Sequence, residues 1–552
     1  MTDSGHRPPA PSLLLLLAGL LVGGLIAGAS VIAVVDAVRG EAPTVAMPAP
    51  TFSEETGSDG IDQVYDGEFQ YFVGGGAAVM DCNLDELPDL FLAGGTNEAG
   101  LYINRSDVGG PLRFTQIQAD STALEAVTGA YPIDIDSDGV TDLVVLRVGG
   151  NVILRGLGDC RFEAANDLWG IDGGNGWTVA FSASWEEEQV MPTLAFGNYL
   201  ALDGLEDRRH CDNSLLIRPR GERYQYPTPL APGWCTLSIL FSDWSRQGDR
   251  DLRMTNDRHY YRDGQEQLWR IEPGESPELY TEADGWQTMQ IWGMGIASHD
   301  VTGDGTPEVF LTSQGDNKMQ TLAQGTDKPI YEDIALSLGA TAHRPFIGDI
   351  NRPSTAWHAE FGDVNNDAFI DLLVTKGNVE AMPEFATDDP NNLLLGQPDG
   401  TFVEGASAAD ILDYGRSRGG ALADLNLDGL LDLVVVDRRE EVRVWRNTGA
   451  GGNWLAVDIR QAPPNSDAIG AWVEARIGST VMRTEVTIGG GHAGGELGPL
   501  HFGLGRAESA DIRVIWPDGE QGDWTSVDVN RRVVVDRQSG NTSTPDPIQD
   551  GG

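Results

Sequence analysis

Lysine is nearly absent from this sequence of 552 residues, which also contains only four cysteines. Lysine occurs only at Lys318, Lys328 and Lys376, so arginine supplies most of the positive charge. Acidic residues number 84 against 37 lysines and arginines, and the formal net charge is −47 at pH 7. This charge disfavours binding to a nucleic-acid backbone or to an anionic membrane surface. It fits a solvated acidic surface or, as the alternative, an acidic docking face.

The sequence also lacks a recognisable catalytic motif. It contains no G-x-S-x-G and no H-E-x-x-H pattern, and the glycine-rich stretch 489–495 lacks the ending of a phosphate-binding loop. His299 and His358 each precede an acidic loop, and we interpret both as packing residues. The sequence predicts no catalytic residue.

The sequence does contain a repeated nine-residue acidic pattern, D-x-[DNST]-x-D-x-x-x-[DE]. Its five clear copies supply oxygen-bearing side chains at positions 1, 3, 5 and 9, namely Asp81, Asn83, Asp85, Asp89; Asp134, Asp136, Asp138, Asp142; Asp300, Thr302, Asp304, Glu308; Asp363, Asn365, Asp367, Asp371; and Asp424, Asn426, Asp428, Asp432. Two weaker copies lie between the second and third clear ones. One contains Asp243, Ser245, Gln247 and Asp251, and the other, near Ser182, keeps only Glu186. The chain therefore has seven phased units.

The pattern predicts one cation in each clear loop. Ca²⁺ accepts 6 to 8 oxygen ligands in a flexible geometry, whereas Mg²⁺ requires near-octahedral packing and retains its waters. Gly139, Gly305 and Gly429 at position 6 allow a sharp reversal of the chain. Glu86 and Ala368 replace that glycine in two copies, which we expect to be strained or weaker. We predict Ca²⁺ ions with a mainly structural role, and acidic surface turns without an ion are the alternative.

Short apolar runs flank the loops, for example residues 143–146 and 433–436. Runs of this kind, bounded by glycine and aspartate, predict β-strands, and a further strand follows at 151–155 and 442–446. Units of several strands that bury their faces only by stacking on their neighbours are typical of propeller blades. We predict an all-β fold with a seven-bladed β-propeller.

The C-terminal part carries a second signature. The segments that begin at Asn453, Ala468, Pro499 and Val514 read NWLAV, AIGA, PLHFGLG and VIWPDG. With the repeats, these segments resemble the cartilage acidic protein family, in which an ASPIC/UnbV domain follows FG-GAP repeats. The resemblance implies an integrin-like propeller with calcium loops, a small C-terminal β domain, and adhesion or matrix-like interactions. It also places the glycine-rich stretch 489–495 in that β domain, which favours tight turns there and a structural role for His492 and His501. The chain has Ser466 where that family usually has an arginine, so no role of that arginine is carried over.

An uncharged apolar stretch of residues 12–35 lies near the N-terminus. Its length exceeds that of a typical signal-peptide core and suffices to span a bilayer, so it predicts a signal anchor or transmembrane helix. Secretion after signal cleavage is the alternative. We expect the propeller outside the cytoplasm, periplasmic or extracellular, where free Ca²⁺ is abundant. The predicted segments are a cytoplasmic N-terminus 1–11, the membrane helix 12–35, a linker 36–60, the propeller 61–450, the ASPIC/UnbV domain 451–537 and a flexible tail 538–552.

The four cysteines suit an exported protein with disulfides, and three complete pairings exist on paper. The best local candidate is Cys211 with Cys235. Cys82 and Cys160 would then pair across the first blades or remain buried thiols.

Two functions remain open. The first is a calcium-binding, non-enzymatic module that binds an extracellular protein or glycan and meets the membrane only through its N-terminal helix. The second is a carbohydrate-active lyase or hydrolase with a site at the mouth of the propeller. Tryptophans recur near the loops, and they either pack between blades or stack sugars: Trp177, Trp185, Trp244, Trp286, Trp292 and Trp357.

Overall fold

The computed structural model describes residues 45–187, 189–203, 210–257, 264–289, 291–326, 328–341, 351–449 and 451–544. Over these residues the regular structure is almost entirely β-strand, so the prediction of an all-β fold is confirmed. The helical segments are single turns in the connections between strands: η1 (Phe69–Tyr71), α2 (Asn166–Trp169), η3 (Glu282–Asp284), α3 (Ala335–Leu338) and α4 (Ala406–Ala409).

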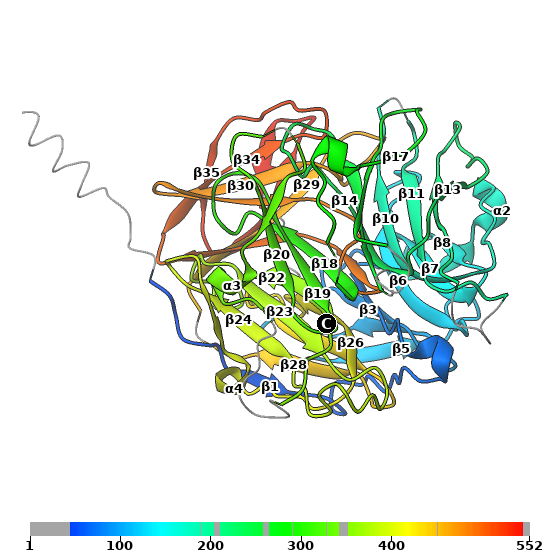
Figure 1. Ribbon diagram of the computed structural model, residues 1–552. Coiled ribbons are helices and arrows are strands. Elements are labelled where there is room, and N and C mark those ends of the chain that lie inside the picture. The colour runs from blue at the N-terminus through cyan, green and yellow to red at the C-terminus, as the bar shows by residue number, and fades with distance from the viewer. Residues whose placement is uncertain are drawn as a thin grey trace, which may run out of the picture.

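Most strands fall into units of four antiparallel strands, in which each strand pairs with the next one along the chain (Figure 1). The second and third units also pair with each other over two residues and so form one eight-stranded sheet. Six units are continuous in sequence: β2 (Ala77–Met80), β3 (Asp89–Leu92), β4 (Gly100–Asn104), β5 (Phe114–Ile117); β6 (Val127–Ile133), β7 (Asp142–Gly149), β8 (Val152–Gly156), β9 (Phe162–Ala164); β10 (Gly176–Ser184), β11 (Thr193–Asn198), β12 (Ser214–Ile217), β13 (Thr228–Leu230); β14 (Thr236–Ser242), β15 (Asp251–Asn256), β16 (Gln267–Arg270), β17 (Glu278–Leu279); β18 (Gly293–His299), β19 (Glu308–Ser313), β20 (Lys318–Leu322), β21 (Tyr331–Asp333); and β22 (Ala356–Gly362), β23 (Asp371–Lys376), β24 (Asn392–Gly396), β25 (Phe402–Glu404).

One further unit is assembled from both ends of the repeated region. It contains β26 (Ser417–Ala423), β27 (Asp432–Asp437) and β28 (Arg443–Asn447), and its outer strand is β1 (Phe52–Glu54). β1 runs antiparallel to β28, with Phe52 opposite Asn447. The prediction that residues 36–60 form a linker is therefore wrong at β1. Its three residues carried no loop pattern that could have marked them as part of a unit.

The first strands of the units lie next to one another in chain order. β2 contacts β6, the series continues through β10, β14, β18 and β22 to β26, and β26 contacts β2. The backbone N–H of Gly419 on β26 donates to the carbonyl of Gly75, just before β2, at 3.0 Å. These strands are short and buried, and they carry small or apolar residues that allow close neighbours, as in β6, where every residue is buried. The arrangement is propeller-like.

The C-terminal residues form a separate pair of four-stranded sheets. One sheet contains β29 (Asn453–Arg460), β33 (Leu500–Gly505), β36 (Arg531–Asp536) and β37 (Asn541–Ser543), and the other contains β30 (Trp472–Ile477), β31 (Thr480–Glu485), β34 (Ser509–Ile515) and β35 (Thr525–Asp528). Apolar residues that alternate along these strands, such as Leu455, Val457 and Ile512, form their common core. β37 lies within the segment predicted as a flexible tail, so that prediction is wrong for Asn541–Ser543.

The predicted membrane segment 12–35 lies outside the described residues. Among the residues that are described, no helix is long and apolar enough to cross a membrane. The four cysteines form two disulfides, Cys82–Cys160 between the first two units and Cys211–Cys235.

Candidate metal loops

Each of the five clear acidic loops joins the first strand of a unit to its second strand. The loops connect β2 to β3, β6 to β7, β18 to β19, β22 to β23 and β26 to β27. We name them by their first residues as loops 81, 134, 300, 363 and 424. Because they occupy the same place in each of these five units, they lie at the same end of the strands.

The first aspartate of a loop holds the turn together. The Asp134 carboxylate accepts hydrogen bonds from the backbone N–H groups of Asp138 (3.1 Å) and Gly139 (2.9 Å). Asp81, Asp363 and Asp424 accept the equivalent pair of bonds, whereas Asp300 accepts one, from Gly305 at 3.3 Å.

The sixth residue of every clear loop has a positive φ. The φ of Gly139 is 84°, and Glu86 and Ala368 adopt 73° and 72° in its place. Such a conformation costs a residue with a side chain about 1–2 kcal/mol. At Gly429 a β-carbon would also lie 1.9 Å from the Trp454 ring of the C-terminal domain. Glycine there serves both the turn and the contact between domains.

The side chains at positions 3 and 5 also make hydrogen bonds within several loops. In three loops the amide oxygen at position 3 accepts the N–H of position 5, as between Asn83 and Asp85 at 3.1 Å. Asn365 and Asn426 do the same for Asp367 and Asp428. In loop 300 the Thr302 hydroxyl instead donates to Glu308 at 3.1 Å, and Asp304 accepts the N–H of Thr306.

The carboxylate at position 9 connects each loop to the third strand of its unit. Asp142 is fully buried and accepts the backbone N–H groups of Ile135 and Gly156, both at 2.8 Å. Asp89, Asp371 and Asp432 make the corresponding pairs of bonds. Position 9 therefore has a structural role, whether or not an ion is bound, that the sequence pattern alone did not reveal.

Burial, followed by the charge of neighbouring carboxylates, raises the pKa of several of these groups. The pKa of Asp134 rises to about 7 and that of Asp142 to about 8. The same causes raise the pKa of Asp363 to about 8 and that of Asp424 to about 7. Crowded carboxylates of this kind require a proton or a counter-charge.

Loop 134 is the clear loop with carboxylates at positions 1, 3 and 5. Single ligand oxygens of Asp134, Asp136 and Asp138 all lie within 4.8 Å of one another. Arg155 pairs with one oxygen of Asp136 at 2.8 Å and one of Asp138 at 2.7 Å. The other oxygen of Asp136, Oδ1, is buried and has no hydrogen-bond partner. A buried acceptor among converging oxygens fits a hard divalent cation, so the residues of this loop suit Ca²⁺.

In the two weaker copies, protein groups take up the charge. Asp243 keeps the first-position bonds to the N–H groups of Gln247 and Gly248, and the positive charges of Arg250 and Arg246 act on it. Glu186 accepts bonds from Thr193 and Arg218 at 2.7 and 2.6 Å. The copy at Asp243 retains the turn, and the described residues of neither copy contain a set of converging carboxylates.

The C-terminal domain rests on the loops. Arg483 pairs with Asp300 at 2.8 Å, and Asn465 donates its backbone N–H to Ser137 in loop 134 at 2.8 Å. His501 lies 2.6 Å from the Asn366 side chain in loop 363. In Figure 1 this domain, orange to red, lies against the repeated units. No sequence pattern indicated that the loops contact another part of the same chain.

The glycine-rich stretch 487–497 leaves this domain and enters the centre of the repeated units. It forms isolated bridges to Ala183, Leu240, Ile296 and Ala130, and its strand β32 (Gly495–Leu497) pairs in parallel with β2. A β-carbon on Gly129, in β6, would lie 1.7 Å from the Ala493 carbonyl. Glycine on the first strands is therefore needed to admit this segment, which we name the plug.

His492 anchors the plug. Its Nε2 accepts the N–H of Gly74 at 3.1 Å, and its own backbone N–H donates to Nδ1 of His358 at 3.1 Å. Burial lowers the pKa of His492 to about 3 and that of His358 to about 4. Both rings are neutral in this setting, in keeping with a packing role.

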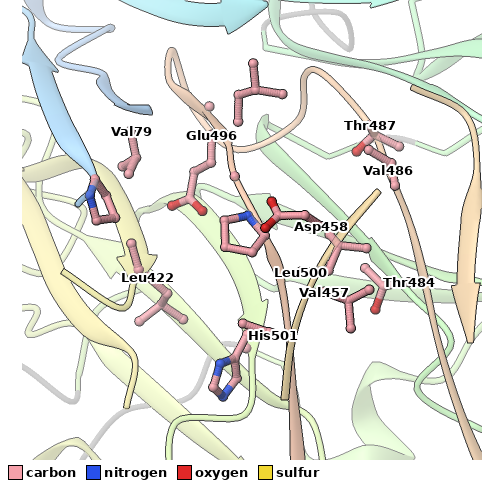
Figure 2. Close-up of a pocket in the computed structure, with 18 of the residues that line it drawn as sticks. Val79, Leu422, Val457, Asp458, Thr484, Val486, Thr487, Glu496, Leu500 and His501 are labelled. Atoms are coloured by element: carbon pink, nitrogen blue, oxygen red, sulfur yellow. The ribbon is translucent and has the colours of Figure 1, made fainter. Parts of the chain in front are cut away.

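Between the plug, the first strands and the C-terminal domain lies a cavity of about 1310 Å³. Figure 2 shows its mixed wall, with apolar Val79, Leu422 and Leu500 and polar Asp458, Glu496 and His501. The carboxyls of Glu360 and Glu496 hydrogen-bond to each other there, and burial raises the pKa of Glu360 to about 8.

Comparison with known families defines the class of protein. The FG-GAP-like repeat family matches residues 81–145 and 363–435, and the ASPIC and UnbV family matches residues 461–542. The chain therefore carries FG-GAP repeats followed by an ASPIC/UnbV domain.

Among curated proteins the chain is homologous to cartilage acidic protein 1. It is 27% identical to the mouse protein over 41% of this chain and 34% of that protein, and 24% identical to the human protein over 47% and 39%. The match thus spans less than half the length of these relatives. A crystal structure of BBS1N in complex with ARL6DN matches with a TM-score of 0.40 and 10% identity, over 70% of this chain and 94% of that one.

Proposed function

We propose that the chain is a calcium-binding, extracytoplasmic β-propeller module that binds a protein or glycan partner in an adhesion-like role. The observation that carries the proposal is loop 134, where converging carboxylates surround a buried oxygen without a partner. The presence of FG-GAP repeats and an ASPIC/UnbV domain supports an extracellular, non-enzymatic role.

We further propose that the propeller has seven blades and that its ring is closed. The unit completed by β1 follows the six continuous units, and the contact of β26 with β2 joins the last unit to the first. An N-terminal strand that completes the last blade ties the two ends of the ring together. Closure in this way protects the sheet edges that an open array would expose.

We assign the propeller to the outside of the cytoplasm. Two disulfides suit an oxidising compartment, and the residues 12–35 supply an apolar segment for export or anchoring. Calcium loops of modest affinity fill where free Ca²⁺ is abundant.

The choice of Ca²⁺ follows from the donors. The loops offer carboxylate, amide and hydroxyl oxygens on a bent backbone, a set that favours the larger cation with the more variable geometry. We expect the ions to stabilise the loops that support the C-terminal domain, and the exposed acidic surface to meet the partner.

Calcium titration of the full chain after EDTA treatment tests the proposal. Several bound ions per chain and a clear rise of the melting temperature would support it. No binding at millimolar Ca²⁺, or an unchanged melting curve, would sink it.

The cavity favours one alternative, a carbohydrate-active lyase or hydrolase that uses Glu360 and Glu496. Glycosidases of the retaining type hold two carboxyls about 5–5.5 Å apart, and inverting enzymes hold them farther apart. Glu360 and Glu496 instead share a hydrogen bond, and the plug occupies the centre of the units. These features favour the binding module. If the wild-type chain cleaves a member of a polysaccharide panel and Glu360→Gln does not, the enzyme is favoured over the binding module.

A further inference from the structure

The unit completed by β1 holds a second group of carboxylates, at the end of its strands opposite loop 424. β27 begins with Asp432 of that loop and ends with Asp437. Nε of Arg443 lies 3.3 Å from Oδ2 of Asp437 and 3.4 Å from Oδ1 of Asp413. Both of these carboxylates are buried. They meet at one guanidinium nitrogen, and neither belongs to the nine-residue pattern.

The turn that precedes β26 brings Asp413 to this place. The backbone N–H of Gly415 donates to Oδ1 of Asp413 at 2.9 Å. A β-carbon on Gly415 would lie 2.7 Å from Oδ2 of Asp437, so the turn needs glycine to pass this carboxylate. Ser417, the first residue of β26, lies directly opposite Asp437 on β27. Their side chains therefore lie side by side on one face of the sheet.

Several oxygen atoms of this group lack a hydrogen-bond donor. Among the described residues, Oδ2 of Asp413, both carboxylate oxygens of Asp437 and Oγ of Ser417 are buried and have no hydrogen-bond partner. Ser417 and Asp437 are both 0% exposed. Buried polar atoms are nearly always satisfied by protein groups, ordered water or an ion. Four such oxygen atoms in one place therefore indicate a ligand that accepts their lone pairs.

The positive charge at this place is too small for the carboxylates around it. Arg443 also pairs with Glu54 at 3.3 Å and with Glu440 at 3.1 Å, so one guanidinium serves four carboxylates. Burial, followed by the charge of Asp413, raises the pKa of Asp437 well above its usual value. A carboxylate in this setting requires a proton or a further counter-charge.

The preceding unit shows a cation in the equivalent position. β23 ends with Lys376 as β27 ends with Asp437, and each of these residues lies opposite the first residue of the first strand of its unit. Nζ of Lys376 lies 3.1 Å from Oδ1 of Asp389, and both side chains are buried. The ammonium group of one unit is thus replaced in the next unit by a second carboxylate.

We propose that Asp413, Asp437 and Ser417 bind a Ca²⁺ ion, which supplies the positive charge that Lys376 supplies in the preceding unit. Carboxylate and hydroxyl oxygens are hard donors, and Ca²⁺ completes such a set with water ligands in a flexible geometry. The site lies at the opposite end of the strands from the acidic loops, so it does not depend on Ca²⁺ binding there. Its ion stabilises the unit in which the two ends of the repeated region meet.

Equilibrium dialysis of the full chain against Ca²⁺, after EDTA treatment, tests the site. Asp437→Asn should bind one ion fewer than the wild-type chain. Asp437→Lys, which copies the residue of the preceding unit, should lose the same ion because its ammonium group takes the place of the cation. Asp316→Asn is the matched control, at an exposed carboxylate that follows β19 at the same end of its unit, and it should bind the wild-type number.

A comparison with loop 134 separates this inference from the proposed function. Asp136→Asn should lose a different ion, so the double variant with Asp437→Asn should lose two. If Asp437→Asn binds as many ions as Asp316→Asn, the carboxyl pair holds a proton in place of a cation and the inference is wrong. If Asp437→Asn loses an ion and Asp136→Asn does not, the inference stands and the proposed calcium site in loop 134 fails.

Discussion

The position-9 carboxylate of loop 424 offers the sharpest test of how these loops are built. Asp432 is fully buried, and its two oxygens accept the N–H groups of Leu425 (3.0 Å) and Asn447 (2.7 Å). In Asp432→Asn one oxygen becomes an NH₂ group that faces a backbone donor. One buried N–H then loses its acceptor, which costs about 1–3 kcal/mol. The melting temperature in EDTA should fall by about 2–6 °C.

The assay is thermal unfolding followed by circular dichroism, in EDTA and in millimolar Ca²⁺. In Ca²⁺ the loss should be larger, because the substitution also removes charge from the proposed ion site, and dialysis should find one ion fewer. Asp120→Asn, at an exposed carboxylate, is the matched control and should change neither quantity. If the two variants melt within about 1 °C of each other in both media, Asp432 does not stabilise the loop in this way. A penalty of ~1 kcal/mol would lower the melting temperature by more than that.

Three further outcomes are expected. In EDTA the free energy of unfolding should fall from pH 6.5 to 8, because Asp134 and Asp142, with pKa values of about 7 and 8, bind protons in the folded state that the unfolded state has released. A pH series of denaturant titrations measures this slope, and Ca²⁺ should flatten it. Arg483→Gln should lower the free energy of unfolding by about 2 kcal/mol in EDTA, because Asp300 loses its guanidinium partner, and Ca²⁺ should restore part of this stability. An equal loss of stability in both media would contradict this prediction. Gly129→Ala should destabilise the chain by about 1–3 kcal/mol through its clash with the plug, while Gly498→Ala, which has open space, should not, as urea unfolding would reveal.

The loops and strands were predictable because their signals are local. An aspartate at position 1 and a residue that accepts a positive φ at position 6 specify the turn within nine residues, and the apolar runs on either side specify the strands. β1 was missed because a three-residue strand such as Phe52–Glu54 has no periodicity of its own. Its partner β28 lies at the other end of the repeated region, so no local pattern could have indicated the pairing.

The plug shows a different limit. Its glycines read as tight turns, and several do have a positive φ, including Gly489, Gly490 and Gly491. What the sequence could not show is that the glycines of the plug and those on the first strands serve one contact. Gly76 and Gly129 each leave space for the Ala493 carbonyl. Two sets of glycines, far apart in sequence, are thus required together, and a substitution in either set should loosen the C-terminal domain from the units. The domain is therefore held from two sides, by its plug and by the charged loops, and removal of Ca²⁺ should weaken only the second attachment.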